Sequence, residues 1–331
     1  MSKIAIIGAG SWGTALATVV SGKGHDVFMW TRSDEQRGSM RKHKENVKYL
    51  PEIKFDDNIT ICETIEESIS GADAVLFSVP TQAFRKTFES ALPFLDNDKV
   101  IINVAKGIEQ NTLKRLSEVA YELRKDVKYA VLSGPSHAEE VGRKLPTTVA
   151  IASEDTEIAK YVQDLFFTDR FRTYVNDDVV GVELGGALKN IIALGAGISD
   201  GMGFGDNAKA ALMTRGLTEI SRLGIALGAK QETFAGLTGM GDLIVTCTSM
   251  HSRNRRCGIM IGEGLSPVEA TEKIGMVVES MFTTKAAYGL AKKVGVEMPI
   301  TEKIYEVING ELKAADAVEI LMGRERKNEK V

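Results

Sequence analysis

One lysine stands alone in an apolar stretch of the chain. Residues 184–198 read LGGALKNIIALGAGI, and Lys189 is the only charged residue among them. The apolar residues recur every three to four positions, which predicts a helix. An ammonium group is costly to bury, but burial lowers its pKa toward the range of general acid–base catalysis. Lys189 is therefore a candidate proton donor or acceptor for the interconversion of a carbonyl and an alcohol.

Structural explanations for Lys189 stay open beside this functional one. The side chain could reach the surface along its own stem, or it could pair with Glu183 or Asp242. The functional explanation requires space next to the lysine. Small residues on the same helix face are expected to leave that space: Gly185, Gly186, Ala193 and Ala196.

A second group of polar residues follows in the last third of the chain. Asp242 ends the glycine-rich turn GMGD, and ten residues later the segment SRNRR (252–256) places three arginines in four positions. Guanidinium groups match the geometry of phosphate oxygens. The combination predicts a small, anionic, hydroxylated substrate, whereas a basic surface run that binds nothing is the alternative.

The N-terminus carries a glycine-rich turn between a predicted strand and a predicted helix. Gly8, Gly10 and Gly13 form the pattern GAGSWG after the apolar run IAII, and TALATVVSGKG follows. Such glycines allow a tight turn, close approach of the backbone to a pyrophosphate, and close packing of helix on sheet. The turn therefore predicts a bound dinucleotide, with a glycine-rich turn that binds no ligand as the alternative.

The end of the second strand indicates which dinucleotide binds. NAD-specific sites usually place an acid there for the ribose 2′-hydroxyl, but this chain has Trp30-Thr31-Arg32. Because an arginine can pair with a 2′-phosphate, we favour NADP(H). Asp34 and Glu35 lie close enough to serve a free hydroxyl, so NAD(H) remains an alternative, as does an Arg32 that only contacts solvent.

Polar residues also follow other predicted strands at their carboxyl ends, where ligands bind in open α/β sheets. Lys106 interrupts an apolar strand just before a glycine, and Ser136 follows the strand YAVLSG. A lysine that points to water and a serine that caps the helix HAEEVG are the structural alternatives. The histidines and cysteines form no ligand pattern, so no metal site is predicted.

Elements of two kinds position these residues. Apolar strands separated by helical patterns, such as 112–125, predict a Rossmann-type, mostly parallel α/β sheet in the first half. From about residue 181 the patterns are helical throughout, and Ser266 has the sequence context of a capping box. We therefore expect an α/β domain over 1–180 and an all-α domain over 181–331. The expected strands are 3–8, 26–31, 59–62, 74–79, 99–105, 129–134 and 147–153.

Bulk properties exclude several classes of protein. The chain of 331 residues has a net charge of −4, which gives no indication of a nucleic-acid partner. Its 3 cysteines lack the spacing of a disulfide framework, which fits a reducing compartment. The N-terminus lacks the pattern of a signal peptide, and an uninterrupted run of about 20 apolar residues is missing. We expect a cytoplasmic protein without membrane insertion.

Taken together, these motifs resemble the bacterial-type NAD(P)-dependent glycerol-3-phosphate dehydrogenases over nearly the whole chain. The resemblance implies reversible reduction of dihydroxyacetone phosphate to sn-glycerol 3-phosphate, which supplies phospholipid synthesis. The stretches that carry it are GAGSWGTALA (8–17), VAKGIE (104–109), LSGPSHAEEV (132–141), ELGGALKNIIALGAGISDGMGFGDNAKAAL (183–212), GDLIVTCTS (241–249), SRNRRCG (252–258), VVES (277–280) and TTKAAYGLAKK (283–293).

The same resemblance assigns roles to individual residues. It implies that Lys189 is the proton donor or acceptor, assisted by Lys106 and Asp242. The implied substrate contacts are Lys106, Gly134, Ser136, Lys189, Asp242, Ser252, Arg253 and Asn254. The implied cofactor contacts, beside the glycines of the turn, are Ser11, Trp12, Arg32, Lys106, Ala138, Arg253, Val277 and Glu279.

Three residues depart from what is usual in the family, namely His137, Cys257 and Ser280, but none of them removes a functional group. Two other functions remain as alternatives. A 3-hydroxy-acid dehydrogenase of the same layout would need a carboxylate clamp and no phosphate site. A non-enzymatic NADPH sensor would need the glycine turn but not Lys189. A homodimer through the helical domain is a further expectation.

Overall fold

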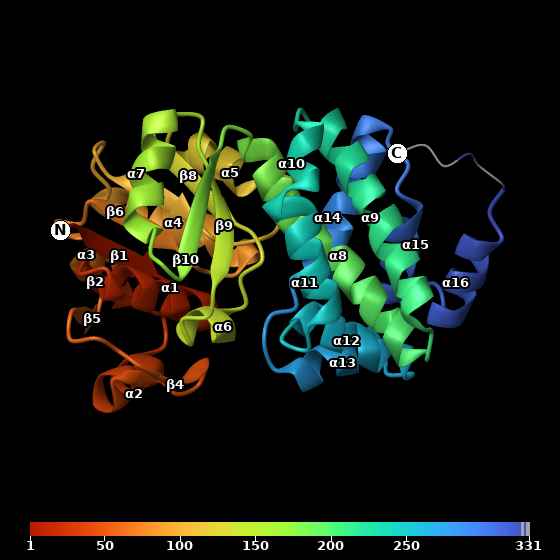
Figure 1. Ribbon diagram of the computed structural model, residues 1–331, viewed down its shortest axis with the longest axis horizontal. Coiled ribbons are helices and arrows are strands. Elements are labelled where there is room, and N and C mark those ends of the chain that lie inside the picture. The colour runs from red at the N-terminus through yellow and green to blue at the C-terminus, as the bar shows by residue number, and fades with distance from the viewer. Residues whose placement is uncertain (326–327, 329–331) are drawn as a thin grey trace. The chain divides into compact units, whose positions relative to one another are not determined.

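The computed structural model describes residues 1–325 and 328 of the chain. The chain divides into two compact units (Figure 1). Residues 1–105 and 116–182 form the first, and residues 106–115 join the chain from 183 onward in the second. The division thus falls two residues after the expected one and assigns the segment 106–115 to the helical unit.

The first unit is built on an eight-stranded sheet with the order β10-β9-β8-β7-β6-β1-β2-β5. All neighbours pair in parallel except β8 and β9, so the prediction of a mostly parallel sheet is confirmed. The strands are β1 Lys3–Ile7, β2 Asp26–Trp30, β5 Ile59–Ile61, β6 Ala74–Phe77, β7 Val100–Asn103, β8 Lys128–Ser133, β9 Thr147–Ala152 and β10 Phe171–Asn176. Strand β10 was not predicted because its side chains alternate between buried and exposed at the sheet edge.

Helices cover both faces of this sheet. Ile4 and Ile6 of β1 pack into one apolar cluster with α1, and Ala5 and Ile7 pack into a second cluster with α4 and α5. The helices are α1 Ser11–Gly22, α2 Asp34–His43, α3 Ile65–Ile69, α4 Phe84–Ala91, α5 Leu116–Leu123, α6 Ala138–Gly142 and α7 Thr156–Phe166, with short 3-10 turns at Thr81–Ala83 and Leu92–Phe94. A separate hairpin, β3 Glu45–Asn46 and β4 Leu50–Lys54, lies outside the sheet.

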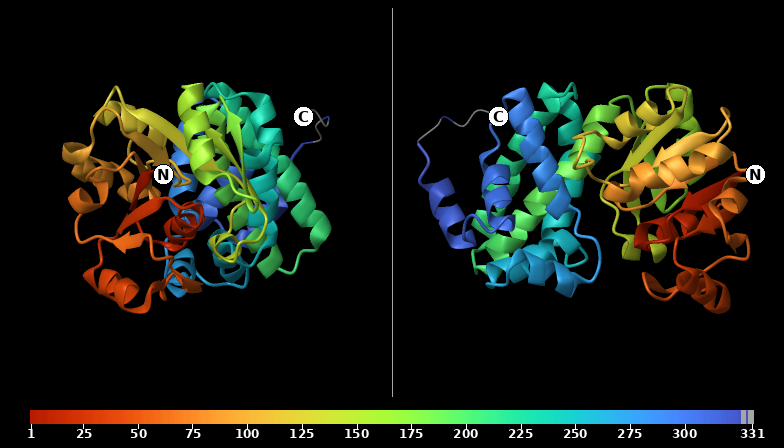
Figure 2. Two further views of the ribbon diagram at one scale, coloured as in Figure 1. Left: turned by 60° about the vertical axis from the view of Figure 1, so that its left-hand side comes forward. Right: turned by 180° about the vertical axis from the view of Figure 1, so that it is seen from behind.

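The second unit consists of helices, as the two further views in Figure 2 also show. They are α8 Val179–Gly201, α9 Asp206–Ala226, α10 Gln231–Ala235, the π-helical turn η3 Leu237–Gly241, α11 Asp242–Thr248, α12 Arg253–Gly262, α13 Pro267–Ile274, α14 Ser280–Val294, α15 Pro299–Ile308 and α16 Ala314–Met322. The capping box predicted at Ser266 is present at the start of α13 and is therefore confirmed.

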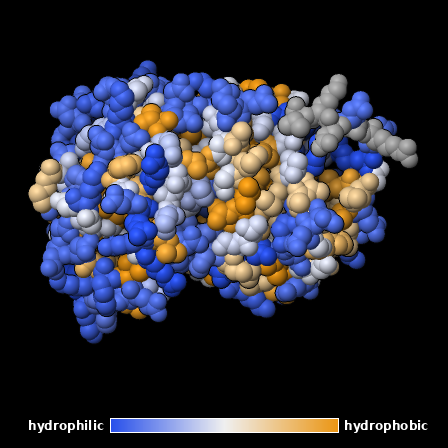
Figure 3. All heavy atoms as spheres, viewed as in Figure 1, coloured by the Kyte–Doolittle hydropathy of each residue, from blue (hydrophilic) through white to orange (hydrophobic). Residues whose placement is uncertain are grey.

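Helix α8 is the central helix of the second unit. By length and hydropathy it is apolar enough to cross a membrane, but 94% of that apolar window is buried inside the protein, as in a core helix. The apolar stretch around Lys189 is therefore accounted for by protein packing. On the face of the molecule seen in Figure 3, hydrophilic residues predominate and hydrophobic ones lie between them.

Glycines bring α8 and α12 into backbone contact. A Cβ atom on Gly197 of α8 would lie 2.0 Å from the Arg255 carbonyl oxygen, and one on Gly258 of α12 would lie 2.1 Å from the Leu194 carbonyl oxygen. Side chains larger than hydrogen would force the two helices apart. This close approach holds the N-terminus of α12, with its arginines, beside the helix that carries Lys189.

The segment 106–115 belongs to the helical unit because its contacts are there. Arg115 forms an ion pair of 2.9 Å with Glu183 at the start of α8. Asn190 Nδ2 donates a hydrogen bond of 3.3 Å to the Lys106 carbonyl oxygen. The segment thus holds Lys106 beside α8.

Candidate active site

Lys189 is buried and bonded to two side chains. Only 5% of the residue is exposed. Its Nζ donates hydrogen bonds to Asp242 Oδ1 and, over 2.7 Å, to Thr246 Oγ1. The alternative in which Lys189 reaches the surface is therefore wrong. Of the two carboxylates considered as partners, Lys189 pairs with Asp242, whereas Glu183 pairs with Arg115.

A second lysine meets the same carboxylate. Lys106 Nζ lies 2.8 Å from Asp242 Oδ2, so the two oxygens of Asp242 each hold one ammonium group. The side chain of Asp242 is 1% exposed and that of Lys106 is 17% exposed. Three candidate residues from separate parts of the sequence thus form one cluster, with Lys106 as its partly exposed member.

The electrostatics of this cluster suit acid–base chemistry. Burial lowers the pKa of Lys189 to about 8, with Asp242 opposing and Lys106 reinforcing the shift. Burial alone would raise the pKa of Asp242, but the ammonium groups of Lys106 and Lys189 outweigh it and keep that pKa below its usual value. Asp242 therefore stays a carboxylate, while Lys189 titrates near neutral pH.

Local backbone features place these groups. Gly185 allows the Thr238 carbonyl oxygen to approach α8, since a Cβ atom at Gly185 would lie 2.6 Å from it. Thr238 belongs to η3, and α11 begins directly after η3 with Asp242. The small residues beside Lys189 were expected to leave space for a ligand, but at Gly185 the space is taken by the chain that carries Asp242.

Two further polar residues of the site were not predicted from the sequence. Thr246 lies one helical turn after Asp242 and donates a hydrogen bond of 2.6 Å to the Asp242 carbonyl oxygen. Asn190 follows Lys189, and its Oδ1 accepts a hydrogen bond of 2.9 Å from Asn254 Nδ2. The i, i+4 spacing from Asp242 could have indicated Thr246, whereas the Asn190–Asn254 pair depends on helix packing.

The arginine-rich segment divides into residues with different roles. Arg255 forms an ion pair of 2.7 Å with Asp200 of α8, and Lys209 of α9 lies 2.8 Å from the same carboxylate. Asp200 therefore ties α8, α9 and α12 together, and Arg255 serves as the partner from α12. Ser252 caps α12 and accepts a hydrogen bond of 3.2 Å from the Arg255 amide, which leaves half-buried Arg253 at the first position of the helix. A helix N-terminus with an arginine favours an anion.

The glycine turn of the first unit fits a dinucleotide pyrophosphate. Gly8 has φ +108°, and a Cβ atom there would lie 2.3 Å from the Ser78 carbonyl oxygen, whereas nothing lies within 4 Å of a Cβ position on Gly10. The first turn of α1 contains no acidic residue, and Gly10 caps it without a side chain. The first amide groups of α1 have no hydrogen-bond partner within the helix. The backbone at the N-terminus of α1 is thus open to an anion. A Cβ atom on Gly13 would lie 2.2 Å from the Gly8 carbonyl oxygen, as close helix–turn packing requires.

The end of β2 presents an exposed cation, and of the two acids nearby Glu35 is exposed as well. Arg32 is exposed, and within residues 1–325 it forms no ion pair. Asp34, one of the two acids considered for a free ribose hydroxyl, instead pairs with Arg37. Trp12, at the start of α1, has an indole Nε1 that is buried without a hydrogen-bond partner. Of these residues, Arg32 is the one suited to a phosphate.

The strand-end residues lie after β8. Gly134 has φ +144°, and Ser136 Oγ donates a hydrogen bond of 2.8 Å to its carbonyl oxygen. The N-cap of α6 is His137, so the alternative in which Ser136 caps that helix is wrong. Ala138 is the first residue of α6. His137 thus occupies a capping position.

The loop before α14 contains the remaining predicted ligand residues. Val277 is 37% exposed, and Glu279 is the N-cap residue of α14. The amide of Ser280 donates a hydrogen bond of 3.0 Å to Asn254 Oδ1, which connects this loop through Asn190 to the Lys106 segment. Cys257, the last departure from the family, is buried on α12.

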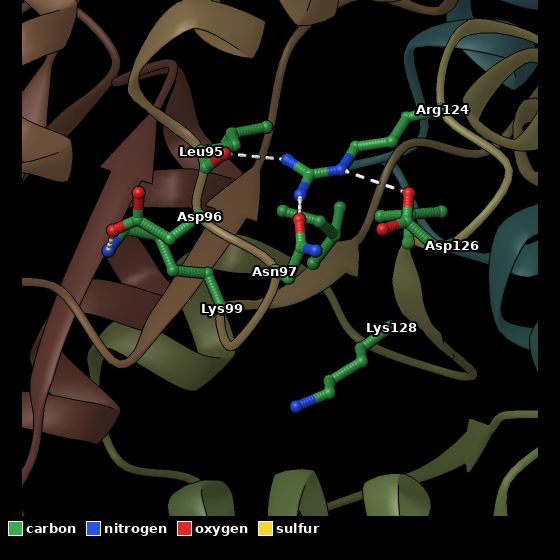
Figure 4. A pocket seen from close by; sticks show the side chains of 9 residues that line it. Leu95, Asp96, Asn97, Lys99, Arg124, Asp126 and Lys128 are labelled. Atoms are coloured by element: carbon green, nitrogen blue, oxygen red, sulfur yellow. Dashed lines mark hydrogen bonds and ion pairs between the residues drawn. The ribbon is translucent and has the colours of Figure 1, made fainter.

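A hollow lined mainly by the segments that precede β7 and β8 has another character (Figure 4). Its polar groups bond to one another: Arg124 donates to the Leu95 carbonyl oxygen over 2.6 Å, and Lys99 lies 2.9 Å from Asp96. Its lining residues differ from all those predicted to bind ligand. Over the described part of the chain, no three histidine, cysteine or acidic side chains come together in a way that could hold a metal ion.

Comparisons with known proteins identify the family. A model of the N-terminal domain of NAD-dependent glycerol-3-phosphate dehydrogenase matches residues 3–159, and the model of the C-terminal domain matches 178–319. Glycerol-3-phosphate dehydrogenase [NAD(P)+] of Pelotomaculum thermopropionicum is 54% identical, over 99% of this chain and 95% of the relative. The enzyme of the same name from Clostridium perfringens is 50% identical over the full length of both chains.

Solved structures agree with this result. The crystal structure of glycerol-3-phosphate dehydrogenase from Coxiella burnetii is 40% identical, with a TM-score of 0.94 over 98% of this chain and 99% of that one. Ketopantoate reductase from Ralstonia eutropha, at 14% identity and a TM-score of 0.62, shares the fold alone. The chain belongs to the NAD-dependent glycerol-3-phosphate dehydrogenase family.

Proposed function

We propose that this protein is an NAD(P)-dependent glycerol-3-phosphate dehydrogenase that reduces dihydroxyacetone phosphate to sn-glycerol 3-phosphate, reversibly, and so supplies phospholipid synthesis. The observation that carries the proposal is the buried Asp242 carboxylate with an ammonium group on each oxygen. A 3-hydroxy-acid dehydrogenase or a sensor does not account for that cluster together with the arginine at the start of α12.

Lys189 is the proton donor in this proposal. Its ammonium group has three N–H donors, and bonds to Asp242 and Thr246 use two, so one remains for a substrate oxygen. When NAD(P)H is bound, it supplies the hydride for C2. Lys189 then donates a proton from Nζ to the oxygen on C2, while the charge of Lys106 stabilises that oxygen as it becomes negative. Asp242 holds both ammonium groups in position.

The substrate phosphate is assigned to the N-terminus of α12. Arg253 stands at the first helical position, where its guanidinium charge and the helix dipole add. Ser252 and Asn254 flank it and are buried. The further substrate contacts that we propose in the first unit are Gly134 and Ser136.

Cofactor binding is assigned mainly to the first unit. The amide groups of the glycine turn bind the pyrophosphate, and Arg32 binds a 2′-phosphate, so that NADP(H) is favoured and NAD(H) is also accepted. The residues proposed to contact the cofactor are Gly8, Gly10, Ser11, Trp12, Gly13, Arg32, Lys106, Ala138, Arg253, Val277 and Glu279.

We also propose that the protein is located in the cytoplasm and forms a homodimer. Its three cysteines are buried free thiols, which is consistent with a reducing compartment.

The reaction is tested by oxidation of NADPH and NADH with dihydroxyacetone phosphate, measured side by side. Lys189→Ala should lower turnover by about 100- to 10,000-fold, since it removes the proton donor, and NADPH should still bind. Lys303→Ala is the matched control, because that lysine also forms an ion pair in the helical unit, with Glu306. Near-normal turnover of Lys189→Ala would contradict the proposal.

Substrate and cofactor specificity need separate measurements. Arg32→Ala should reduce the preference for NADPH over NADH, because only NADPH carries the 2′-phosphate.

Arg253→Ala should raise the KM for dihydroxyacetone phosphate by about tenfold or more through loss of a charged hydrogen bond. Activity of the wild-type protein with a 3-hydroxy acid instead of dihydroxyacetone phosphate would support the other dehydrogenase class.

A further inference from the structure

The carbonyl oxygen of Ala9 accepts hydrogen bonds from two side-chain amides. Gln36 Nε2 of α2 lies 2.6 Å from it, and Asn46 Nδ2 of the β3–β4 hairpin lies 2.9 Å from it. Ala9 is the residue between Gly8 and Gly10 in the glycine turn. Both lone pairs of this carbonyl oxygen are therefore used by groups from outside the turn.

These bonds determine which way the next amide points. In a planar trans peptide the carbonyl and the following N–H lie antiparallel. A carbonyl of Ala9 held toward Gln36 and Asn46 thus directs the Gly10 N–H the opposite way. The carbonyl oxygen is the negative end of the Ala9–Gly10 peptide dipole. The two hydrogen bonds keep it pointing away from the side on which an anion would approach the helix.

Asn46 cannot turn without losing bonds. It is 1% exposed, and its Nδ2 also donates to Thr14 Oγ1 over 2.8 Å. Its Oδ1 accepts a hydrogen bond of 3.3 Å from the Tyr49 amide. Ser11 Oγ in turn donates to the Tyr49 carbonyl oxygen over 2.7 Å. The hairpin therefore holds both the turn and the first residues of α1.

Gln36 connects the turn to the end of β2. Its Nε2 bonds to the Ala9 carbonyl oxygen, while its Oε1 accepts a hydrogen bond of 3.1 Å from Thr31 Oγ1. Thr31 directly precedes Arg32. One amide thus bridges the two parts of the first unit to which the pyrophosphate and the ribose phosphate are assigned.

We propose that Asn46 and Gln36 are positioning residues that pre-organise the glycine turn for the dinucleotide. This inference rests on the proposed function, because it takes the turn to be the cofactor site. The two side chains act through the Ala9 peptide and not by touching the cofactor. Their loss should weaken NADPH binding and leave the proton-transfer groups of the helical unit unchanged.

The test uses substitutions that keep size and remove the donor. Asn46→Asp and Gln36→Glu each place a carboxylate oxygen against the Ala9 carbonyl, which reverses the interaction from attraction to repulsion. We expect each to raise the Kd for NADPH by about tenfold or more, measured by fluorescence titration of the full chain. At saturating NADPH, kcat should change by less than about twofold.

Asn58→Asp is the matched control. Asn58 Nδ2 also donates to two backbone carbonyl oxygens, those of Ser21 and His25, but outside the turn. Asn58→Asp should lower the melting temperature and leave the Kd for NADPH unchanged. If Asn46→Asp does not unfold cooperatively and so is not properly folded, Gln36→Glu tests the inference instead. Gln36 is only partly buried on α2, so this variant is expected to fold.

The outcomes separate this inference from the proposed function. Wild-type affinity for NADPH in folded Asn46→Asp or Gln36→Glu would overturn the inference and leave the enzyme assignment intact. An equal loss of affinity in Asn58→Asp would overturn it too, because a general loss of stability would then explain the effect. Absence of NADPH binding by the wild-type protein would instead contradict the proposed cofactor.

Discussion

Asp242 and Lys189 are bonded within the helical unit, and the second carboxylate oxygen of Asp242 holds Lys106 at 2.8 Å. Asp242→Asn keeps the shape but removes the negative charge between two ammonium groups. We expect kcat to fall by about 100-fold or more, because Lys189 is no longer held in place. The carboxylate of Asp242 also raises the pKa of Lys189. Its removal should therefore lower that pKa and move the pH profile of kcat to lower pH.

Asp200→Asn is the control for this change. Asp200 is also a carboxylate between two cations, Lys209 and Arg255, although it is more exposed than Asp242. The Asp200→Asn variant should have a lower melting temperature, but its kcat should change much less than that of Asp242→Asn. Equal losses of kcat in the two variants would mean that charge bridging between helices, not proton transfer, explains the role of Asp242.

The pH dependence should have opposite signs in the two directions of the reaction. Reduction requires the ammonium form of Lys189, and oxidation requires its neutral amine. Because burial lowers the pKa of Lys189 to about 8, kcat for reduction should decrease and kcat for oxidation should increase as the pH rises through about 8. Initial rates at saturating substrate, from pH 6 to 10, measure both limbs. Two parallel profiles would rule out Lys189 as the titrating group.

The contact between α8 and α12 should not tolerate a methyl group. A Cβ atom on Gly258 would lie 2.1 Å from the Leu194 carbonyl oxygen, so Gly258→Ala should cost about 2 kcal/mol or more of unfolding free energy. Urea denaturation measures the loss. Gly38→Ala is the control, since nothing lies within 4 Å of its Cβ position inside α2, and it should stabilise by about 0.5–1 kcal/mol.

Glu52 occupies a backbone conformation that suits glycine. Its φ is +70°, and its side chain makes an exposed contact of 3.6 Å with Arg143. Glu52→Gly should raise the unfolding free energy by about 0.5–1 kcal/mol, because it removes left-handed strain. Thermal unfolding compares it with Glu52→Ala, which loses the same contact but retains a Cβ atom. A gain of the same size in Glu52→Ala would attribute the effect to the lost charge.

Local sequence determined much of the first unit. The strand that ends at Ile7 and the helix that begins at Ser11 follow from apolar runs and glycines that act within a few residues. The capping box at Ser266 is equally local. β10 escaped prediction because an edge strand buries only one face, so its apolar residues are interrupted by residues such as Arg172.

The tertiary structure decided what the isolated residues do. The sequence singled out Lys189, Lys106 and Asp242, but their meeting on one carboxylate depends on η3 and on the segment 106–115, which are far apart along the chain. Likewise, the sequence could not separate Arg255, which ties helices together, from Arg253. Residue type and spacing specify local chemistry and elements, whereas partners distant in sequence are chosen by how those elements pack.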